Sequence, residues 1–150
     1  MKKVFFSILL ISLSLVACKE KQVVSQLDID KHKILNYLEK NKLEAESHTS
    51  GIYYIINKPG SNAKPEVSST VTVAYDGKLL DGSRFDRSET FTSPLSNLIQ
   101  GWQIGVPLIG EGGQIKLFIP STLGYGSKPR PSIPANSVLV FDISLNSFSN

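Results

Sequence analysis

The sequence predicts an α+β fold in which a curved antiparallel β-sheet wraps around one short helix, with an extra helix before the sheet. Three observations support this class. Short strand-like runs separated by turn residues fill most of residues 50–148, one stretch among them has helical periodicity, and an amphipathic segment precedes them. With 150 residues, 41% hydrophobic and 19% charged, the chain suits one globular domain plus short extensions.

The first residues are typical of a bacterial lipoprotein signal peptide. Lys2 and Lys3 precede the apolar run FFSILLISLSLV, which is too short to span a bilayer. The run ends in LVAC, which resembles the lipobox that is cleaved before an acylated cysteine. A buried free thiol is the alternative for Cys18, but this cysteine closes the apolar run and has no second cysteine to pair with.

We therefore predict a signal peptide at 1–17 and lipidation of Cys18, which would anchor the protein to a membrane of the cell envelope. The residue after Cys18 is not aspartate, and by analogy this favours the outer over the inner membrane. Removal of Lys2 and Lys3 would leave 14 basic against 13 acidic residues, so the charge does not support a nucleic-acid partner. His32 and His48 lack the spacing of metal ligands, and we expect neither a metal nor another cofactor.

Residues 18–27 are expected to form a tether, and residues 28–47 an amphipathic helix. Asp28 or Asp30 could cap its start, and Asn41 lies near its expected end. Its apolar residues recur at helical spacing: Ile34, Leu35, Tyr37 and Leu38. The pattern covers too few heptads for a coiled-coil dimer, so we expect the helix to pack on the domain or its edge.

After Gly51 the pattern changes to that of strands. IYYIINK is rich in β-branched and aromatic residues, and NKPGSNAKP behind it supplies chain breakers. SSTVTVAYDGKLL alternates, and one face of it consists of Val71, Val73 and Tyr75. Asp81-Gly82 is a two-residue hairpin signal before SRFDRS, and ETFTSPL follows with Phe91 pointing inward.

Two more strands and the short helix complete the domain. GGQIKLFIP alternates Ile115, Leu117 and Ile119 with Lys116 and Phe118, and SVLVFDISL forms the final strand. Between Leu98 and Gly113 the apolar residues at helical spacing are Trp102, Val106 and Ile109. Several glycines and Pro107 limit this helix to about two or three turns.

Four motifs then occur in order: YDGKLLDGSRFDRS, LIQGWQIGVPLIGEGGQ, LFIPSTLGYG and IPANSVLVFDISL. Together they resemble the FKBP-type peptidyl-prolyl cis-trans isomerases, a family that also binds the macrolide tacrolimus. The resemblance covers about residues 50–148, and the signal sequence and N-terminal helix further resemble lipoprotein members of that family. It implies a half-barrel sheet, proline-containing polypeptides as substrates, and tacrolimus-like macrolides as inhibitors.

The resemblance also implies site residues. Six would be catalytic: Tyr75, Phe85, Asp86, Trp102, Tyr125 and Phe141. Four would contact the substrate: Phe91, Leu98, Ile99 and Ile133. Trp102 would form the floor under the proline ring, the Ile99 N–H and the Tyr125 hydroxyl would donate to substrate carbonyls, and Ile133 would close the pocket. Simple core packing is the alternative for the aromatic residues, and turn capping for Asp86.

The sequence departs from the family pattern in two places. The arginine that often partners the pocket carboxylate has no clear counterpart, although Arg84 or Arg87 could substitute. The loop 127–135 has Pro129 and Ser132 where relatives often carry a histidine and an aliphatic residue, and it is too short for an inserted chaperone domain. The sequence therefore predicts a membrane-anchored isomerase for extracytoplasmic proteins, and the alternative is a non-catalytic FKBP-like module that holds proline-containing segments of an envelope partner.

Overall fold

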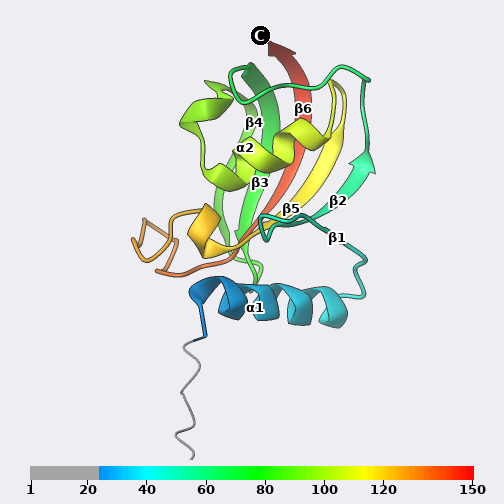
Figure 1. Cartoon of the computed structure of the whole chain (residues 1–150). Coiled ribbons are helices and arrows are strands. Elements are labelled where there is room, and N and C mark those ends of the chain that lie inside the picture. The colour runs from blue at the N-terminus through cyan, green and yellow to red at the C-terminus, as the bar shows by residue number, and fades with distance from the viewer. Residues whose placement is uncertain (1–23) are drawn as a thin grey trace, which may run out of the picture.

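The computed structural model describes residues 24–150 and shows one six-stranded antiparallel sheet with two helices, which confirms the predicted fold class. The expected signal peptide at 1–17 and Cys18 lie outside the described residues. The strand order is β1-β2-β5-β6-β3-β4, so the last strand of the chain lies inside the sheet (Figure 1). The elements are α1 Gln26–Lys40, β1 Glu46–Ser47, β2 Tyr53–Lys58, β3 Thr70–Leu79, β4 Arg84–Pro94, α2 Gln100–Gly105, β5 Gln114–Ile119 and β6 Leu139–Ser149, with 3₁₀ turns at Leu95–Asn97, Val106–Leu108 and Ser121–Leu123.

Helix α2 lies across the inner face of the sheet, and two of its glycines allow this close approach (Figure 1). A Cβ on Gly101 would lie 2.4 Å from Ile119 Cγ2, and one on Gly105 would lie 2.5 Å from Leu117 Cδ1. A larger residue at either position would force the helix away from β5. The apolar positions expected on this helical stretch are all buried: Trp102, Val106 and Ile109.

The alternation predicted for the strands is present, and it separates two cores. The main core between the sheet and α2 includes Val71, Val73, Ile115, Leu117 and Ile119. Phe118, which alternates with the β5 residues of that core, is fully buried on the opposite face in a second apolar cluster.

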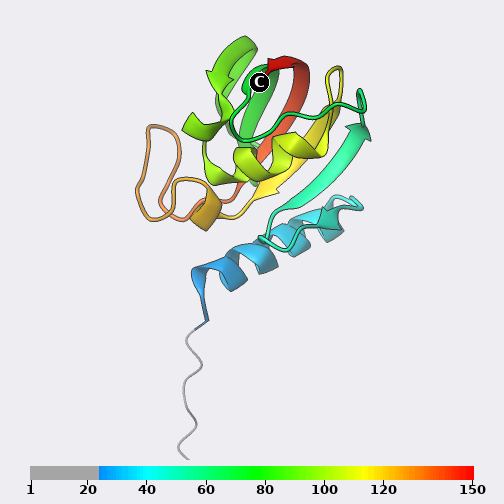
Figure 2. The same cartoon turned by 45° about the horizontal axis from the view of Figure 1, so that its top comes forward.

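Helix α1 packs on this second cluster and crosses one end of the sheet (Figures 1 and 2). Its buried apolar residues are Ile34 and Leu38, and the side chains they pack with are Tyr53, Phe118, Val138 and Val140. Leu35, expected on the buried face, is 41% exposed, and the buried position one turn before Ile34 belongs to Asp30. Among residues 24–150, no helix has the length and apolar composition needed to cross a membrane.

The ends of α1 differ from the expected range 28–47. Ser25 is the N-cap, because its Oγ accepts a hydrogen bond from the Asp28 N–H at 3.1 Å, and the end of the expected tether therefore belongs to the helix. Asn41 is the C-cap, and Lys42 follows with a φ of 53°. The Leu43 N–H donates to the Leu38 carbonyl at 2.9 Å, which ends the helix in a Schellman motif.

The turn between β3 and β4 is present where Asp81-Gly82 predicts it, but it is longer than two residues. The Leu79 N–H donates to the Ser83 carbonyl at 2.9 Å, so residues 80–83 form the loop. Asp81 Oδ1 accepts from the Ser83 N–H at 2.8 Å, and Gly82 has a φ of 87°. This side-chain closure favours the longer turn over a two-residue one, and β4 then continues without a break to Pro94.

Candidate active site

An apolar cavity of about 290 Å³ lies beside α2 on the inner side of the sheet. Strands β3, β4 and β6, helix α2, the segment before α2 and the loop after the Ser121–Leu123 turn contribute its lining. The lining consists of Tyr75, Phe85, Asp86, Phe91, Asn97, Leu98, Ile99, Trp102, Tyr125 and Phe141. The fold thus brings together nine of the ten site residues expected from the sequence. Asn97, in the 3₁₀ turn before α2, is an addition that no sequence signal marks.

Edge-to-face contacts hold the aromatic rings of this cavity. The ring centroid of Trp102 lies 5.2 Å from that of Tyr75 and 5.2 Å from that of Phe141, with interplanar angles of 85° and 90°. Phe85 meets Phe141 at 5.4 Å, and Phe91 meets Tyr75 at 5.7 Å. Each such pair contributes about 0.5–1.5 kcal/mol beyond its buried area. The walls of the cavity are therefore held in place before any ligand binds.

A glycine beneath two of these rings is a site residue that sequence reasoning missed. A Cβ on Gly77 would lie 2.7 Å from Phe85 Cε2 and 2.9 Å from Phe141 Cε1. Gly77 lies inside β3, next to a register irregularity with β4. A glycine inside an alternating strand is the signal that could have found it, because such glycines mark bulges and close approaches.

The carboxylate at the cavity, Asp86, is bonded to one of the aromatic walls. The Tyr75 hydroxyl donates to Asp86 Oδ2 at 2.7 Å. Burial of the phenol, and then this hydrogen bond, raise the pKa of Tyr75 well above its usual value near 10. Tyr75 therefore keeps its proton at neutral pH, and the pair holds the tyrosine ring against Trp102.

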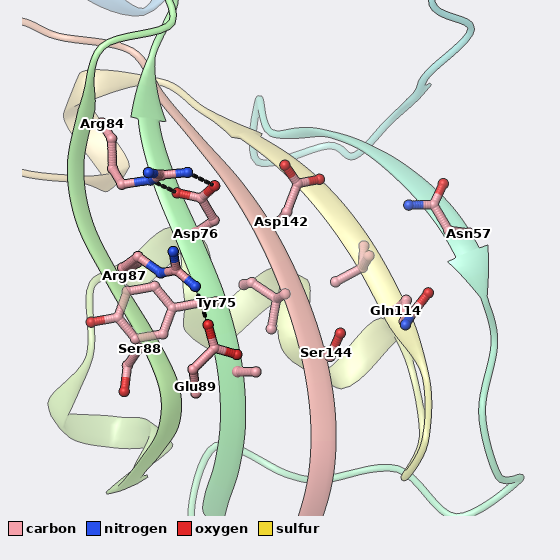
Figure 3. A pocket seen from close by; sticks show the side chains of 13 residues that line it. Asn57, Tyr75, Asp76, Arg84, Arg87, Ser88, Glu89, Gln114, Asp142 and Ser144 are labelled. Atoms are coloured by element: carbon pink, nitrogen blue, oxygen red, sulfur yellow. Dashed lines mark hydrogen bonds and ion pairs between the residues drawn. The ribbon is translucent and has the colours of Figure 1, made fainter.

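The two arginines near Asp86 lie on the outer side of the sheet, in a depression of about 330 Å³ (Figure 3). Arg84 donates to Asp76 through Nε at 2.6 Å and Nη2 at 2.9 Å, and Arg87 pairs with Glu89. The expectation that one of them partners Asp86 is wrong, because each arginine binds a different carboxylate. In Figure 3, where α2 lies behind the sheet, both ion pairs lie on the β3 and β4 side of the depression.

Two hydrogen-bond donors at the cavity are not used by the described part of the chain. The Ile99 carbonyl accepts from the Trp102 N–H at 2.9 Å and the Gln103 N–H at 3.2 Å, but the Ile99 N–H bonds to no residue among 24–150. The Tyr125 hydroxyl also has no hydrogen-bond partner within this range. Both groups can therefore donate to a ligand bound at the cavity.

Trp102 is at once a core residue and part of the cavity lining. It is 4% exposed and belongs to the main core, so the core interpretation and the site interpretation of this residue both hold. Its indole Nε1 is buried without a hydrogen-bond partner among the described residues. An unpaired buried donor is unfavourable by about 1–3 kcal/mol, which the free protein tolerates at this position.

Ile133 does not line the cavity that it was expected to close. It is 6% exposed and packs in the main core. Backbone hydrogen bonds of 2.9 and 3.0 Å join Arg130 and Ile133 in a narrow turn, and Ser132 within it has a φ of 63°. This turn holds Ile133 against the core, and the loop instead meets the cavity through Arg130, whose Cζ lies 5.3 Å from the ring centroid of Tyr125.

Comparison with known proteins agrees with this geometry. The family model for FKBP-type peptidyl-prolyl cis-trans isomerase matches residues 61–146. The FKBP-type peptidyl-prolyl cis-trans isomerase FkpA of Aeromonas hydrophila is 45% identical over 115 residues, which are 73% of this chain and 43% of that protein. FkpA of Escherichia coli (strain K12) is 44% identical over 115 residues, with the same coverage. The chain therefore spans less than half the length of these relatives.

Solved structures show the same likeness. The crystal structure of FkpA from Escherichia coli superposes with a TM-score of 0.73 and 38% identity, covering 81% of this chain and 60% of that one. A peptidyl-prolyl cis-trans isomerase from Pseudomonas syringae pv. tomato gives a TM-score of 0.71 with 27% identity, covering 85% and 98%. On its sequence, its fold and its cavity, the chain belongs to the FKBP-type peptidyl-prolyl cis-trans isomerase family.

Proposed function

We propose that the protein is a peptidyl-prolyl cis-trans isomerase that acts on proline-containing polypeptides. The observation that carries this proposal is the aromatic cavity. It offers an apolar surface for a proline ring, beside two hydrogen-bond donors that have no partner within residues 24–150. Membership of the family supports the proposal, as do the names of its relatives. Tacrolimus-like macrolides would compete for the same cavity.

Rotation about an X-Pro bond needs neither a nucleophile nor a proton transfer, because no covalent bond is made or broken. The barrier of ~18–20 kcal/mol comes from the loss of amide resonance. The planar amide is more charge-separated than the twisted one, so water stabilises the planar form more. Transfer of the bond into a cavity walled by Trp102, Tyr75 and Phe141 removes that stabilisation, which raises the planar state relative to the twisted one.

Hydrogen bonds to the flanking peptide would supply the rest of the effect. The Ile99 N–H and the Tyr125 hydroxyl can hold the carbonyls around the proline in a turn that suits the twisted form. Each neutral hydrogen bond contributes about 0.5–1.5 kcal/mol, and only bonds that fit the twisted form better accelerate the reaction. A million-fold acceleration would require ~8 kcal/mol from all contributions together.

The test is a prolyl isomerisation assay with the full-length protein in detergent. It should accelerate cis–trans exchange of a short X-Pro peptide, and tacrolimus should inhibit it. The fluorescence of Trp102, the chain's single tryptophan, should change when either ligand binds. Trp102→Leu should weaken binding in a domain that still folds. A folded protein that leaves the exchange rate unchanged would refute the proposal.

A binding module without turnover is the second candidate function. One observation favours it, namely that Ile133 does not line the cavity, so the loop 127–135 encloses a ligand less than expected. For such a module, Trp102 fluorescence would respond to the peptide while the isomerisation rate stayed at its uncatalysed value.

We also propose that Cys18 is lipidated and that the isomerase acts outside the cytoplasm on proteins folding in the cell envelope. The apolar run and the LVAC sequence support this proposal. Intact mass spectrometry of membrane-purified protein should show an acylated N-terminal cysteine, and Cys18→Ser should give an uncleaved or soluble product. An unmodified Cys18 in membrane-purified protein would contradict lipidation.

A further inference from the structure

Helix α1 carries a carboxylate that is completely buried against the sheet domain. Asp30 is 0% exposed, although aspartate is seldom buried without partners. Its Oδ2 accepts hydrogen bonds from the N–H and the Oγ of Ser121, at 2.8 and 2.5 Å. Its Oδ1 accepts from Gln26 Nε2 at 2.8 Å and from Lys33 Nζ at 3.3 Å. Each oxygen of the carboxyl group therefore has two hydrogen-bond partners.

Ser121, which binds this carboxylate, begins the short chain segment that contains Tyr125. Figure 1 shows the start of α1 beside the orange 3₁₀ turn, which is Ser121–Leu123. The Ser121 carbonyl accepts from the Gly126 N–H at 2.8 Å, and the Gly126 carbonyl accepts from the Asn136 N–H at 2.8 Å. Tyr125 therefore lies within a short chain segment whose two ends are bonded to each other.

These bonds return to the helix and close a ring. The Asn136 carbonyl accepts from Lys33 Nζ at 3.5 Å, and Lys33 also pairs with Asp30. The ring thus runs from Asp30 through Ser121, Gly126 and Asn136 to Lys33 and back to Asp30. Apolar packing of Ile34 on Phe118 could hold α1 on the sheet by itself, but it makes no contact that would fix the turn around Tyr125.

We propose that Asp30 is a positioning residue for the isomerase site and that α1 belongs to that site. Through Ser121, Asp30 fixes the turn that presents the Tyr125 hydroxyl to the substrate. This inference rests on the proposed function, because Tyr125 is the donor to which that function assigns a substrate bond. It also means that residues before the family match at 61–146 help to position the site.

Variants in the full-length protein test the inference. Asp30→Ala removes both acceptor oxygens, and with them all four hydrogen bonds. It should lower kcat/KM by about 2- to 13-fold, which is the range expected for loss of the Tyr125 hydrogen bond itself. Asp30→Asn keeps one oxygen for Ser121 and should recover much of the activity. If Asp30 acts through Tyr125, then Asp30→Ala combined with Tyr125→Phe should be no slower than Tyr125→Phe alone.

A control on the same helix separates this effect from general loosening of α1. Asp28→Ala removes an exposed carboxylate of the first turn that takes no part in the ring, and kcat/KM should stay within about twofold of wild type. If Asp30→Ala does not fold, Ser121→Ala replaces it in the double variant with Tyr125→Phe, because it removes one donor of the same contact. The inference is overturned if the activity loss in the double variant equals the product of the losses in the two single variants.

Amide hydrogen exchange gives a readout that does not depend on activity. The Gly126 and Asn136 amides, which close the ring, should exchange at least 10-fold faster in Asp30→Ala, while the amides of β5 and β6 keep their protection. Unchanged exchange at both amides would overturn the inference even if activity fell. If the wild-type protein shows no isomerase activity, the proposed function fails, and the exchange experiment alone decides whether Asp30 fixes the turn.

Discussion

Replacing Gly77 with alanine should damage the cavity more than it damages the fold. The added Cβ would lie 2.7 Å from Phe85 Cε2 and 2.9 Å from Phe141 Cε1, whereas carbon atoms in favourable contact lie about 3.5–4.0 Å apart. The Phe85 ring must therefore retreat by roughly 0.8 Å, and it can do so because it is half-buried on the edge strand β4. Phe141, which is 4% exposed, has no such freedom.

The expected loss of stability is about 1–3 kcal/mol, which is typical of an overpacked core. The displaced wall should lower kcat/KM by about 10- to 100-fold, because misplacement by about 1 Å at a catalytic site has effects of that size. Urea unfolding followed by Trp102 fluorescence measures the first quantity, and isomerisation of an X-Pro peptide measures the second.

Gly82→Ala is the matched control for this prediction. Gly82 has a φ of 87°, so alanine there is strained by about 1–2 kcal/mol, yet nothing lies within 4 Å of the added Cβ. This variant should lose stability while kcat/KM stays within about twofold of wild type. The reasoning is refuted if Gly77→Ala keeps full activity, or if both alanine variants lose activity to the same extent.

Three further predictions concern the site, the Arg84–Asp76 ion pair and the end of α1. Tyr125→Phe should lower kcat/KM by about 2- to 13-fold, because it removes one hydrogen bond to the substrate. The rate of the wild-type protein should be nearly constant between about pH 5.5 and 8, because no proton is transferred, and a bell-shaped profile would contradict the mechanism. The Arg84 guanidinium, with Lys78, holds the pKa of Asp76 well below its usual value near 3.8, so this pair stabilises the fold above about pH 4 and less as the pH falls further. Acid titration of the free energy of unfolding should show a smaller loss for Asp76→Asn than for wild type. Lys42→Gly should stabilise the protein by about 1 kcal/mol in urea unfolding, because Lys42 ends α1 with a φ of 53°, and an unchanged midpoint would show that this φ carries no strain.

Features set by local chain geometry were predictable from the sequence. The burial of Ile115, Leu117 and Ile119 follows from the fixed period of a strand, and the buried positions of Trp102 and Val106 follow from helical spacing. The residues of the cavity lining were predicted instead from the resemblance of ordered motifs to a known family. That resemblance groups residues that are distant in sequence, which periodicity alone does not do.

The roles of residues that depend on tertiary contacts could not be predicted from the sequence. Asp30 lies near a helix start, where a carboxylate is usually a cap, and only the folded chain brings it to Ser121. Arg84 is close to Asp86 in sequence, but the register between β3 and β4 pairs it with Lys78, and its guanidinium binds Asp76 two residues away on β3. Ile133 was assigned to the cavity by analogy, whereas the turn between Arg130 and Ile133 packs it into the core.

Strand β4 lies at the edge of the sheet, where the proposed polypeptide substrates would approach the cavity. This strand carries Phe85, Asp86 and Phe91 of the cavity, and within the described part of the chain no strand pairs with its outer side. An open strand edge invites another extended chain to add itself to the sheet, which is a route to aggregation. Charged side chains, namely Arg84, Asp86, Arg87 and Glu89, together with Pro94 at its end, oppose such pairing along β4. A polypeptide of the proposed substrate class would therefore approach the cavity and leave again without being retained as a seventh strand.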